Sequence, residues 1–386
     1  MPEALCTQPP AFNYITLQTT KACNLRCSYC YLDPSRAERK QKLSVETTKR
    51  ILSDIVEYHV TNNLPQDLAV VFHGGEALIL GHAYFREVLE HVAHLRRSTP
   101  RKRLLCSIQS NLTLLDDAYC ETFKAHDVSI GTSLDGPPHL HNVNRFGSVA
   151  KDNHAKVMKK IDLARKFGLR VGALCLITKD KLLSAREVLD FFEAEGLNFK
   201  TNRLFMAGHA KENETTLNVT EAEYAAFTCE LFDLWYSRSP RITVDNLMQI
   251  MGVVLSGRNV GGCSHSNCAT KHVTVTPAGD LYTCGRTTQD EAFLLGNVEH
   301  TSFAGLARSP NFLHVARRNP DKIEECASCD LRSVCGSGCM YEAYLRHGTI
   351  FSTDGSCETF RKIYTHIQTK LYTELTHLSL EGEQHA

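Results

Sequence analysis

The spacing of the cysteines limits what this chain can fold into more than any other feature. The chain has 386 residues and 16 cysteines, and eleven of these cysteines fall into two groups. The first group is a C-x3-C-x2-C triplet of Cys23, Cys27 and Cys30. The second group lies toward the C-terminus and holds eight members: Cys263, Cys268, Cys284, Cys326, Cys329, Cys335, Cys339 and Cys357. Cytosolic thiols are kept reduced, so grouped cysteines in a cytosolic protein indicate metal binding or catalysis rather than disulfides.

The composition argues against several classes of partner. Hydrophobic residues make up 42% of the chain, charged residues make up 22%, and the formal net charge is zero at pH 7. This balance does not favour nucleic acid or an anionic membrane surface. No apolar run approaches the roughly 20 residues of a membrane span, and the opening segment lacks the features of a signal peptide. We therefore expect a cytoplasmic protein that binds neither nucleic acid nor membrane.

Short apolar runs alternate with longer amphipathic stretches through the first half of the chain, as in βα units around a parallel sheet. Six buried strands are predicted: Tyr14–Gln18, Leu68–Phe72, Arg103–Ile108, Val128–Ser133, Arg170–Leu176 and Phe199–Leu204. Helices are predicted between them: Val45–Tyr58, Tyr84–Leu95, Asp116–Lys124, Asn153–Phe167 and Ala185–Glu195. Six units are too few for a closed eight-stranded barrel, so we expect an α/β fold with a partial (β/α)6 barrel. Its active site should lie at the carboxyl ends of the strands.

These patterns predict four segments. The partial barrel covers residues 13–207, a helical bridge 208–261, a small Cys-rich domain 262–360, and a C-terminal helix with its tail 361–386. Helical periodicity is weak in the Cys-rich segment until its end, and the polar last residues predict a frayed tail. The density of cysteine and glycine in the third segment indicates a small fold that metal holds together.

The cysteine triplet comes directly after the first predicted strand. Three thiolates can hold three irons of a [4Fe–4S] cluster and leave the fourth iron open for a small chelating ligand. The alternatives are a zinc site with a borrowed fourth ligand and a chance grouping. The triplet resembles the signature motif of the radical S-adenosylmethionine superfamily. That resemblance implies that S-adenosylmethionine binds the open iron and is cleaved to a 5′-deoxyadenosyl radical.

Residues at the ends of later strands resemble the same family. Gly74, Gly75 and Glu76 match its GGE motif, which implies contact with the methionine amino group, and Ala77 stands where the family often has proline. Glycines let a backbone edge approach a ligand closely. The resemblance implies further cofactor-binding residues: Tyr29, Ser110, Asn111, Ser133 and Arg145. For each polar residue taken alone, a loop cap or a surface contact is the alternative.

The eight C-terminal cysteines are the number that two fully ligated [4Fe–4S] clusters require, and a pair of four-cysteine zinc sites is the alternative. Their order and spacing resemble the SPASM extension of peptide-modifying radical enzymes. The resemblance implies one auxiliary cluster on each of two sets: Cys263, Cys268, Cys284 and Cys339, then Cys326, Cys329, Cys335 and Cys357. The expected cofactors are therefore three [4Fe–4S] clusters and S-adenosyl-L-methionine. Fully ligated auxiliary clusters have no free iron for substrate, which favours a role in electron transfer.

Five cysteines have no motif spacing: Cys6, Cys106, Cys120, Cys175 and Cys229. Cys106 and Cys175 lie on predicted strands, where free cysteine is most often a core residue. A thiol that donates hydrogen, as in a radical peptide epimerase, is the functional alternative for these residues.

The resemblance implies an oxidoreductase that modifies a peptide or protein side chain, with an external electron donor of flavodoxin or ferredoxin type. Sulfatase maturases carry an aspartate directly after the third SPASM cysteine, where this chain has Gly285. We therefore favour cross-linking of a ribosomally made peptide, similar to the cyclophane-forming synthases, over formylglycine formation in a sulfatase. An iron–sulfur electron-transfer protein is the non-enzymatic alternative, but it would have no use for the GGE motif.

No residue is assigned as catalytic from the sequence. His73, Asp280, Tyr282 and Arg286 lie near the motif loops and are interpreted as structural. About thirteen residues precede the first strand, which leaves no room there for a leader-binding helix-turn-helix module. The peptide is therefore expected to bind to the barrel and the SPASM surfaces, or to be presented by a separate protein.

Overall fold

The structure is a computed structural model that describes residues 9–146, 152–238, 241–259, 263 and 268–384, with side chains described up to residue 374. Within these residues, nine strands form one sheet with the order β6-β5-β4-β3-β2-β1-β7-β8-β9. The first six strands are all parallel. Their bounds are β1 Tyr14–Thr20, β2 Leu68–Gly74, β3 Leu104–Ser110, β4 Val128–Ser133, β5 Val171–Ile177 and β6 Phe199–Arg203. The predicted α/β class and all six predicted strands are confirmed, with ends that differ by at most two residues.

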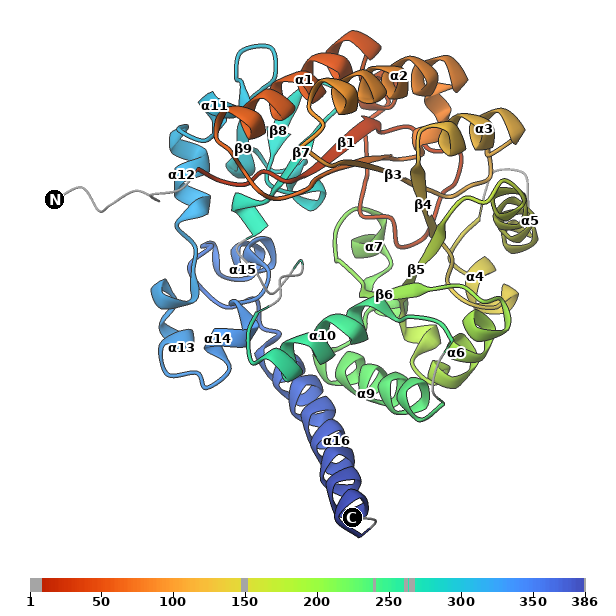
Figure 1. The fold of residues 1–386 in the computed structure, drawn as a ribbon, viewed down its shortest axis with the longest axis vertical. Coiled ribbons are helices and arrows are strands. Elements are labelled where there is room, and N and C mark those ends of the chain that lie inside the picture. Colours follow the sequence, from red (N-terminus) through yellow and green to blue (C-terminus); the bar gives the residue numbers. More distant parts are fainter. Residues whose placement is uncertain (1–8, 147–151, 239–240, 260–262, 264–267, 385–386) are drawn as a thin grey trace, which may run out of the picture.

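Helices cover the outer face of this curved sheet, as Figure 1 shows. The βα helices are α1 Val45–Thr61, α2 His82–Ser98, α3 Asp117–Ala125, α5 Asn153–Lys166 and α6 Ala185–Ala194, with a short α4 Pro138–Asn142 after β4. Alternate strand side chains pack against them: the Phe72 and Phe85 rings, for example, meet edge to face with centroids 5.5 Å apart. Because a strand's side chains alternate between its two faces, the other set points into the barrel.

The Cys-rich region begins as a continuation of the barrel sheet. Strand β7, His272–Val275, pairs in parallel with β1, and β8 Asp280–Tyr282 and β9 Leu294–Asn297 add antiparallel strands beyond it. Tyr14 pairs with His272 and Leu17 with Val275. The third predicted segment therefore shares hydrogen-bonded strands with the first, which brings Cys284 to the rim of the barrel.

The expectation of little helix in the Cys-rich segment is wrong. Five short helices follow β9: α11 Phe303–Leu306, α12 Pro310–Ala316, α13 Glu324–Ala327, α14 Arg332–Cys335 and α15 Met340–His347. Side chains cap two of them, since Ser302 and Ser309 accept hydrogen bonds from backbone N–H groups of their first turns. Each helix is too short to show a clear apolar period, which is why periodicity did not predict it.

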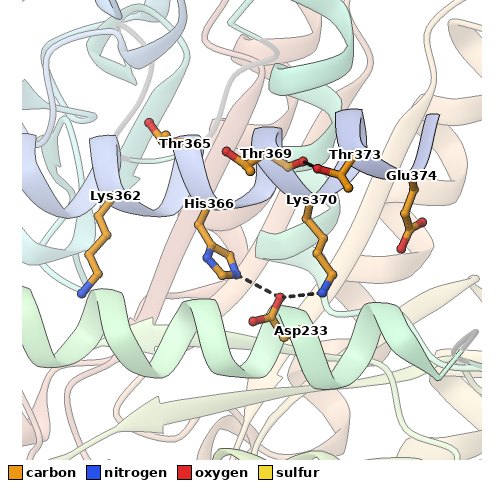
Figure 2. A pocket seen from close by; sticks show the side chains of 8 residues that line it. All are labelled: Asp233, Lys362, Thr365, His366, Thr369, Lys370, Thr373 and Glu374. Atoms are coloured by element: carbon orange, nitrogen blue, oxygen red, sulfur yellow. Dashed lines mark hydrogen bonds and ion pairs between the residues drawn. The ribbon is translucent and has the colours of Figure 1, made fainter. Parts of the chain in front are cut away.

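The bridge and the C-terminus are helical, as predicted. The bridge contains α7 His209–Glu212, α8 Glu214–Leu217, α9 Glu221–Ser237 and α10 Asp245–Ser256. The last helix, α16 Cys357–Gln384, packs along α9, and Figure 2 shows Asp233 of α9 between His366 and Lys370 of α16. Its Oδ1 atom lies 2.9 Å from His366 Nε2 and 3.8 Å from Lys370 Nζ. The expected frayed tail is helical as far as Gln384. Within the described residues, no helix combines the length and the apolar character that crossing a membrane requires.

A pH-dependent stability is expected from His59, which is 1% exposed on α1 and whose Nε2 atom lies 3.3 Å from the Phe12 carbonyl. Burial, followed by the nearby Lys102 charge, lowers the pKa of His59 to about 4. In the unfolded chain this histidine takes up a proton near pH 6.5. Its contribution to stability is therefore complete above pH 6.5 and is lost as the pH falls toward 4, by up to about 1.4 kcal/mol per pH unit. The free energy of unfolding of wild type and of His59→Gln should be measured with denaturant at pH 7, 6 and 5. The wild-type value should fall relative to that of the variant as the pH falls, and a constant difference would contradict the assignment.

Candidate active site at the open end of the barrel

A cavity of about 700 Å³ lies inside the partial barrel, and its lining comes from every parallel strand and from the Cys284 loop. The three cysteines of the triplet and the glycines of GGE line it. So do most of the other residues predicted to bind the cofactor: Tyr29, Ser110, Asn111, Ser133 and Arg145. Of the residues predicted to bind S-adenosylmethionine, Glu76 does not appear in this lining.

The triplet lies on the loop that leaves β1, and N–H donors point at two of its sulfurs. Cys23 Sγ accepts hydrogen bonds from the Leu25 backbone at 3.4 Å and from Asn111 Nδ2 at 3.8 Å. Cys27 Sγ lies 3.9 Å from an Arg145 guanidinium nitrogen. Burial raises the pKa of Cys23 to about 12 and that of Cys27 to about 11, and the Arg145 charge opposes the second shift. Thiols in this setting ionise when a bound metal ion supplies the compensating charge.

The GGE segment is fixed against the chain that leads into the triplet. Gly75 N donates to Thr20 O and Glu76 N donates to Ala22 O, both at 2.8 Å. This pairing leaves no room for side chains: a Cβ on Gly74 would lie 2.2 Å from Thr20 O, and one on Gly75 would lie 2.3 Å from Ala22 O. Gly74 also has φ +142°, a conformation that other residues rarely adopt. The two sequence motifs are thus one structural unit.

The Glu76 carboxylate is 1% exposed and is bound within the protein. It accepts hydrogen bonds from Leu78 N at 3.0 Å, Ser110 Oγ at 2.7 Å and Asn111 N at 2.7 Å. Burial raises its pKa, and these three donors oppose the shift. Glu76 therefore ties the end of β2 to the end of β3. These contacts indicate that Glu76 affects a ligand by positioning the backbone at the ends of these two strands.

Asp135 organises two of the predicted cofactor residues, a role that the sequence did not reveal. Its Oδ2 atom accepts from Arg145 Nε at 3.1 Å and from the Tyr29 hydroxyl, and its Oδ1 atom accepts from Leu176 N at 3.0 Å. The Arg145 guanidinium also lies over the Tyr29 ring, 5.0 Å from its centroid. Burial opposes ionisation of Asp135, but the charges of Arg145 and Lys181 outweigh it and lower the pKa to about 2. The carboxylate is thus a fixed anion that positions both neighbours.

Cys326, Cys329, Cys335 and Cys357 line one small cavity, and Cys263, Cys284 and Cys339 lie near Cys268. The division into two ligand sets stays a prediction. Burial raises the pKa of Cys268, and Cys263, Cys284 and Cys339 raise it further. Burial likewise raises the pKa of Cys326, and the nearby Cys357 and Cys329 raise it further. The pKa of Cys335 is raised to about 12 by burial, with Cys357 and Cys326 adding to it.

In the described part of the chain, no three His, Cys, Asp or Glu side chains are grouped closely enough to hold one metal ion. The assignment of these cysteines as ligands remains a prediction.

The cavity also contains lining residues that the sequence did not single out. Tyr31, Arg203 and Phe205 line it together with Gly285 and Arg286. Arg286 lies 4.7 Å above the centroid of the Phe205 ring and bonds Glu342 Oε1 at 3.0 Å, while Arg203 bonds the other oxygen of Glu342. No sequence spacing links these positions, because they come from different segments of the chain.

Gly285 lines the cavity at a position where a small side chain would fit without a clash. A Cβ built there would lie 3.5 Å from the Tyr31 hydroxyl, which is ordinary contact. Among the described lining residues there is no aspartate or glutamate, while six are arginine or lysine. Three histidines, His73, His209 and His272, also line the cavity. Burial lowers the pKa of His73 and lowers that of His272 to about 4. The described part of the lining therefore lacks the carboxylate that the resemblance to sulfatase maturases implies.

Other residues near the motifs fall into two groups. His73 and Arg286 face the cavity, whereas Asp280 and Tyr282 are not among its lining residues. Asp280 accepts a hydrogen bond from Asn297 at 2.8 Å, and Tyr282 is buried in the core, as the structural interpretation predicted. Four of the cysteines outside the motifs are buried and lie away from this lining: Cys106, Cys120, Cys175 and Cys229. Cys6 lies outside the described residues.

Family models match two regions of the chain. Residues 17–192 match the model of the radical SAM superfamily, and residues 263–330 match the SPASM model of an iron–sulfur cluster-binding domain. The first match covers the parallel strands β1 to β5 and the triplet, and the second covers Cys263 to Cys329. The predicted recognition is confirmed at this level.

Similar proteins span nearly the whole chain at low identity. A cysteine-type anaerobic sulfatase-maturating enzyme of Clostridium perfringens is 23% identical over 362 residues, which cover 92% of this chain and 96% of that enzyme. The structure titled native anSMEcpe with bound AdoMet and Kp18Cys peptide is 19% identical, with a TM-score of 0.78 over 94% of this chain and 99% of that chain. Streptococcus suis SuiB bound to its precursor peptide SuiA is 15% identical, with a TM-score of 0.66 over 92% and 76%. At these identities the structural matches establish the fold.

Gly75→Ala is expected to disrupt the site, because the new methyl group would overlap the Ala22 carbonyl and push the triplet loop out of place. After anaerobic reconstitution, the variant should hold about four fewer iron atoms per chain than wild type. Gly172→Ala is a matched control, since its nearest neighbour would be Asn198 O at 3.9 Å. Full iron content together with normal S-adenosylmethionine binding in Gly75→Ala would contradict the account of this contact.

Proposed function

The chain carries a radical S-adenosylmethionine domain followed by a SPASM domain, and we propose that it removes hydrogen from a peptide side chain and oxidatively cross-links that peptide. One observation carries the proposal. A single cavity is lined by the three cysteines of the triplet, by the GGE backbone and by Cys284 of the first SPASM set. A substrate in this cavity would lie between a radical-generating site and an electron acceptor. The predicted segments, 13–207, 208–261, 262–360 and 361–386, remain our proposed division of the chain.

The residues of the triplet and of the GGE segment fit a cluster with S-adenosylmethionine. Three thiols line the cavity beside the bare backbone of Gly74 and Gly75, and N–H donors already point at Cys23 and Cys27. Hydrogen bonds to ligating sulfurs are a common means of stabilising such clusters. Cys23, Cys27 and Cys30 would hold this cluster, which supplies one-electron reductive cleavage of S-adenosylmethionine.

Arg145 and Ser133 are proposed to contact the cofactor on the barrel side. Asp135 holds Arg145 in place, and Gln109 Nε2 donates to Ser133 Oγ at 3.2 Å. Both side chains are therefore oriented before a ligand arrives, which lowers the entropy lost on binding. Tyr29 packs under the Arg145 guanidinium and is proposed to lie near the adenine.

The two SPASM sets fit clusters that four cysteines ligate completely. Each set gathers its four thiols, and donors again point at sulfur, with Arg286 N at 3.3 Å from Cys284 and Arg361 Nη2 at 3.8 Å from Cys329. Such clusters would supply a one-electron acceptor. A side chain that loses a hydrogen atom to the cofactor, and then one electron and one proton, becomes two hydrogens lighter overall. The electron would leave through these sets to an external carrier of flavodoxin or ferredoxin type.

Gly285 favours cross-linking over formylglycine formation. Formylglycine formation begins with a cysteine thiol or a serine hydroxyl, and a carboxylate after the third SPASM cysteine is thought to accept a proton there. Here the equivalent space faces the Tyr31 hydroxyl, and the described lining carries no carboxylate. Sulfatase maturation remains the second candidate, because maturating enzymes are similar to this chain over about nine-tenths of its length.

Two other candidates have less support. An epimerase would need a thiol at the cavity, and the four described cysteines outside the motifs are buried away from it. A plain electron-transfer protein would not need the GGE backbone fixed against the triplet loop. The similar structures with bound peptides also favour a peptide as the substrate class.

The proposed reaction can be tested with short peptides encoded beside the gene, incubated anaerobically with enzyme, S-adenosylmethionine and dithionite. The expected product is about two mass units lighter than the peptide, with one 5′-deoxyadenosine formed per product, because hydrogen abstraction plus one-electron oxidation removes two hydrogens. Deuterium placed on the reacting side chain should appear in 5′-deoxyadenosine. The variant with Cys23, Cys27 and Cys30 all changed to alanine is the control and should form neither product.

Three outcomes of this experiment would contradict the proposal in different ways. A sulfatase peptide converted to an aldehyde would establish the maturase reaction despite Gly285. A product of unchanged mass that carries solvent deuterium at an α-carbon would indicate epimerisation. Product formation by the triple alanine variant would show that the radical site has been assigned to the wrong residues.

A further inference from the structure

Arg318 is a buried cation in the Cys-rich region. It follows α12 and is 5% exposed. Its Nη1 atom donates to the carbonyl oxygens of Ile350 and Ser352, the latter at 2.9 Å, and its Nη2 atom donates to Ser337 O at 2.7 Å. Among the described residues, the hydrogen-bond partners of this guanidinium are thus neutral backbone groups. A buried charge is costly unless anions nearby compensate it, so the compensation must come from groups farther away.

The position of Arg318 relates it to both SPASM cysteine sets. Ser337, whose carbonyl it binds, lies between Cys335 of one set and Cys339 of the other. Burial lowers the pKa of Arg318, whereas Asp354 and then the thiols of Cys339, Cys268 and Cys326 oppose this shift. Cys339 and Cys268 belong to the first set and Cys326 belongs to the second.

Asp354 also holds the segment that lies between the two cysteine sets. Its Oδ2 atom accepts from Cys339 N at 2.7 Å, and its Oδ1 atom accepts from Ser356 N at 2.9 Å, directly before Cys357. The close approach of Asp354 also requires Gly338, where a Cβ would lie 2.5 Å from the carboxylate. The segment between the two sets is therefore held by one buried cation and one buried anion.

Two other arginines each lie next to a single set. Arg286 lies beside the first set, near Cys263, Cys339 and Cys284, and is balanced by its ion pair with Glu342. Arg361 lies beside the second set, 3.8 Å from Cys329, and is paired with Asp330 at a partly exposed position. Arg318 differs from both because it lies near both sets and its hydrogen-bond partners are backbone carbonyls, with Asp354 as the nearby carboxylate.

We propose that Arg318 is a shared tuning residue that raises the reduction potentials of both auxiliary clusters, so that both accept an electron more readily. This inference rests on the cluster assignment made under the proposed function. Reducing a cluster adds one electron and therefore one negative charge, and a fixed cation nearby stabilises the reduced state more than the oxidised state. Burial strengthens this effect, because little water separates the charges.

The test is an EPR-monitored redox titration of the anaerobically reconstituted full-length protein, with dithionite as the reductant. Arg318→Gln removes the charge, Arg318→Lys keeps it, and Arg317→Gln removes the same charge from an exposed neighbouring position. In Arg318→Gln, the equilibrium constant for one-electron reduction should fall at least tenfold at both auxiliary clusters, which corresponds to about 59 mV. Arg318→Lys should retain most of the wild-type value, and Arg317→Gln should leave it unchanged.

The pattern across variants separates this role from others. Arg361→Gln should shift one cluster alone, so a shift at both clusters in Arg318→Gln identifies the shared position. Unchanged potentials in Arg318→Gln, with iron content equal to wild type, would overturn the inference. Loss of a cluster in Arg318→Gln would also overturn it and would assign the residue to folding. Failure of the wild-type protein to bind auxiliary clusters would instead refute the proposed function.

Discussion

The hydrogen bonds that join Thr20 and Ala22 to Gly75 and Glu76 hold the candidate site together, and much of the surrounding structure depends on them. They extend the pairing of β1 with β2 past the end of the sheet and lead directly into Cys23. Glu76 then links this unit to the end of β3 through Ser110 and Asn111. Three thiols, a bare glycine backbone and two strand ends are thereby fixed relative to one another before any ligand binds. Such preorganisation is what a site for a reactive intermediate requires, because misplacement of the reacting atoms lowers the rate steeply.

Periodicity predicted the barrel well, because its strands are buried runs separated by amphipathic helices. Leu68–Gly74 and Val128–Ser133 could be read in this way from the sequence alone. The pairing of β7 with β1 could not, because more than two hundred residues separate the strands and a four-residue strand has no distinctive pattern. The short SPASM helices escaped periodicity for the same reason, although Ser309 before Pro310 is a readable start of a helix.

Residues of the candidate site could be predicted from the sequence where a motif requires one residue type at one position. Cys23 was predicted from the C-x3-C-x2-C spacing, and Gly75 from its resemblance to the GGE motif. The role of Asp135 could not be predicted, since it arises from contacts with Tyr29 and Arg145 that only the fold creates. The meeting of Tyr31 with Gly285 likewise joins two loops that are distant in the sequence. Glu76 was expected to face the ligand, and its burial shows that a charged motif residue can serve the backbone instead.

One cavity is bordered by the proposed cluster with an open iron and by a proposed cluster that is fully ligated, and this arrangement is the central claim. Mössbauer spectroscopy of protein reconstituted with ⁵⁷Fe, recorded with and without S-adenosylmethionine, tests this claim most directly. The account predicts three [4Fe–4S] clusters, in which a single iron changes its signal when S-adenosylmethionine is added, because the triplet provides three ligands and the two SPASM sets provide four each. A spectrum that does not respond to S-adenosylmethionine, or one that contains a single cluster, would contradict it.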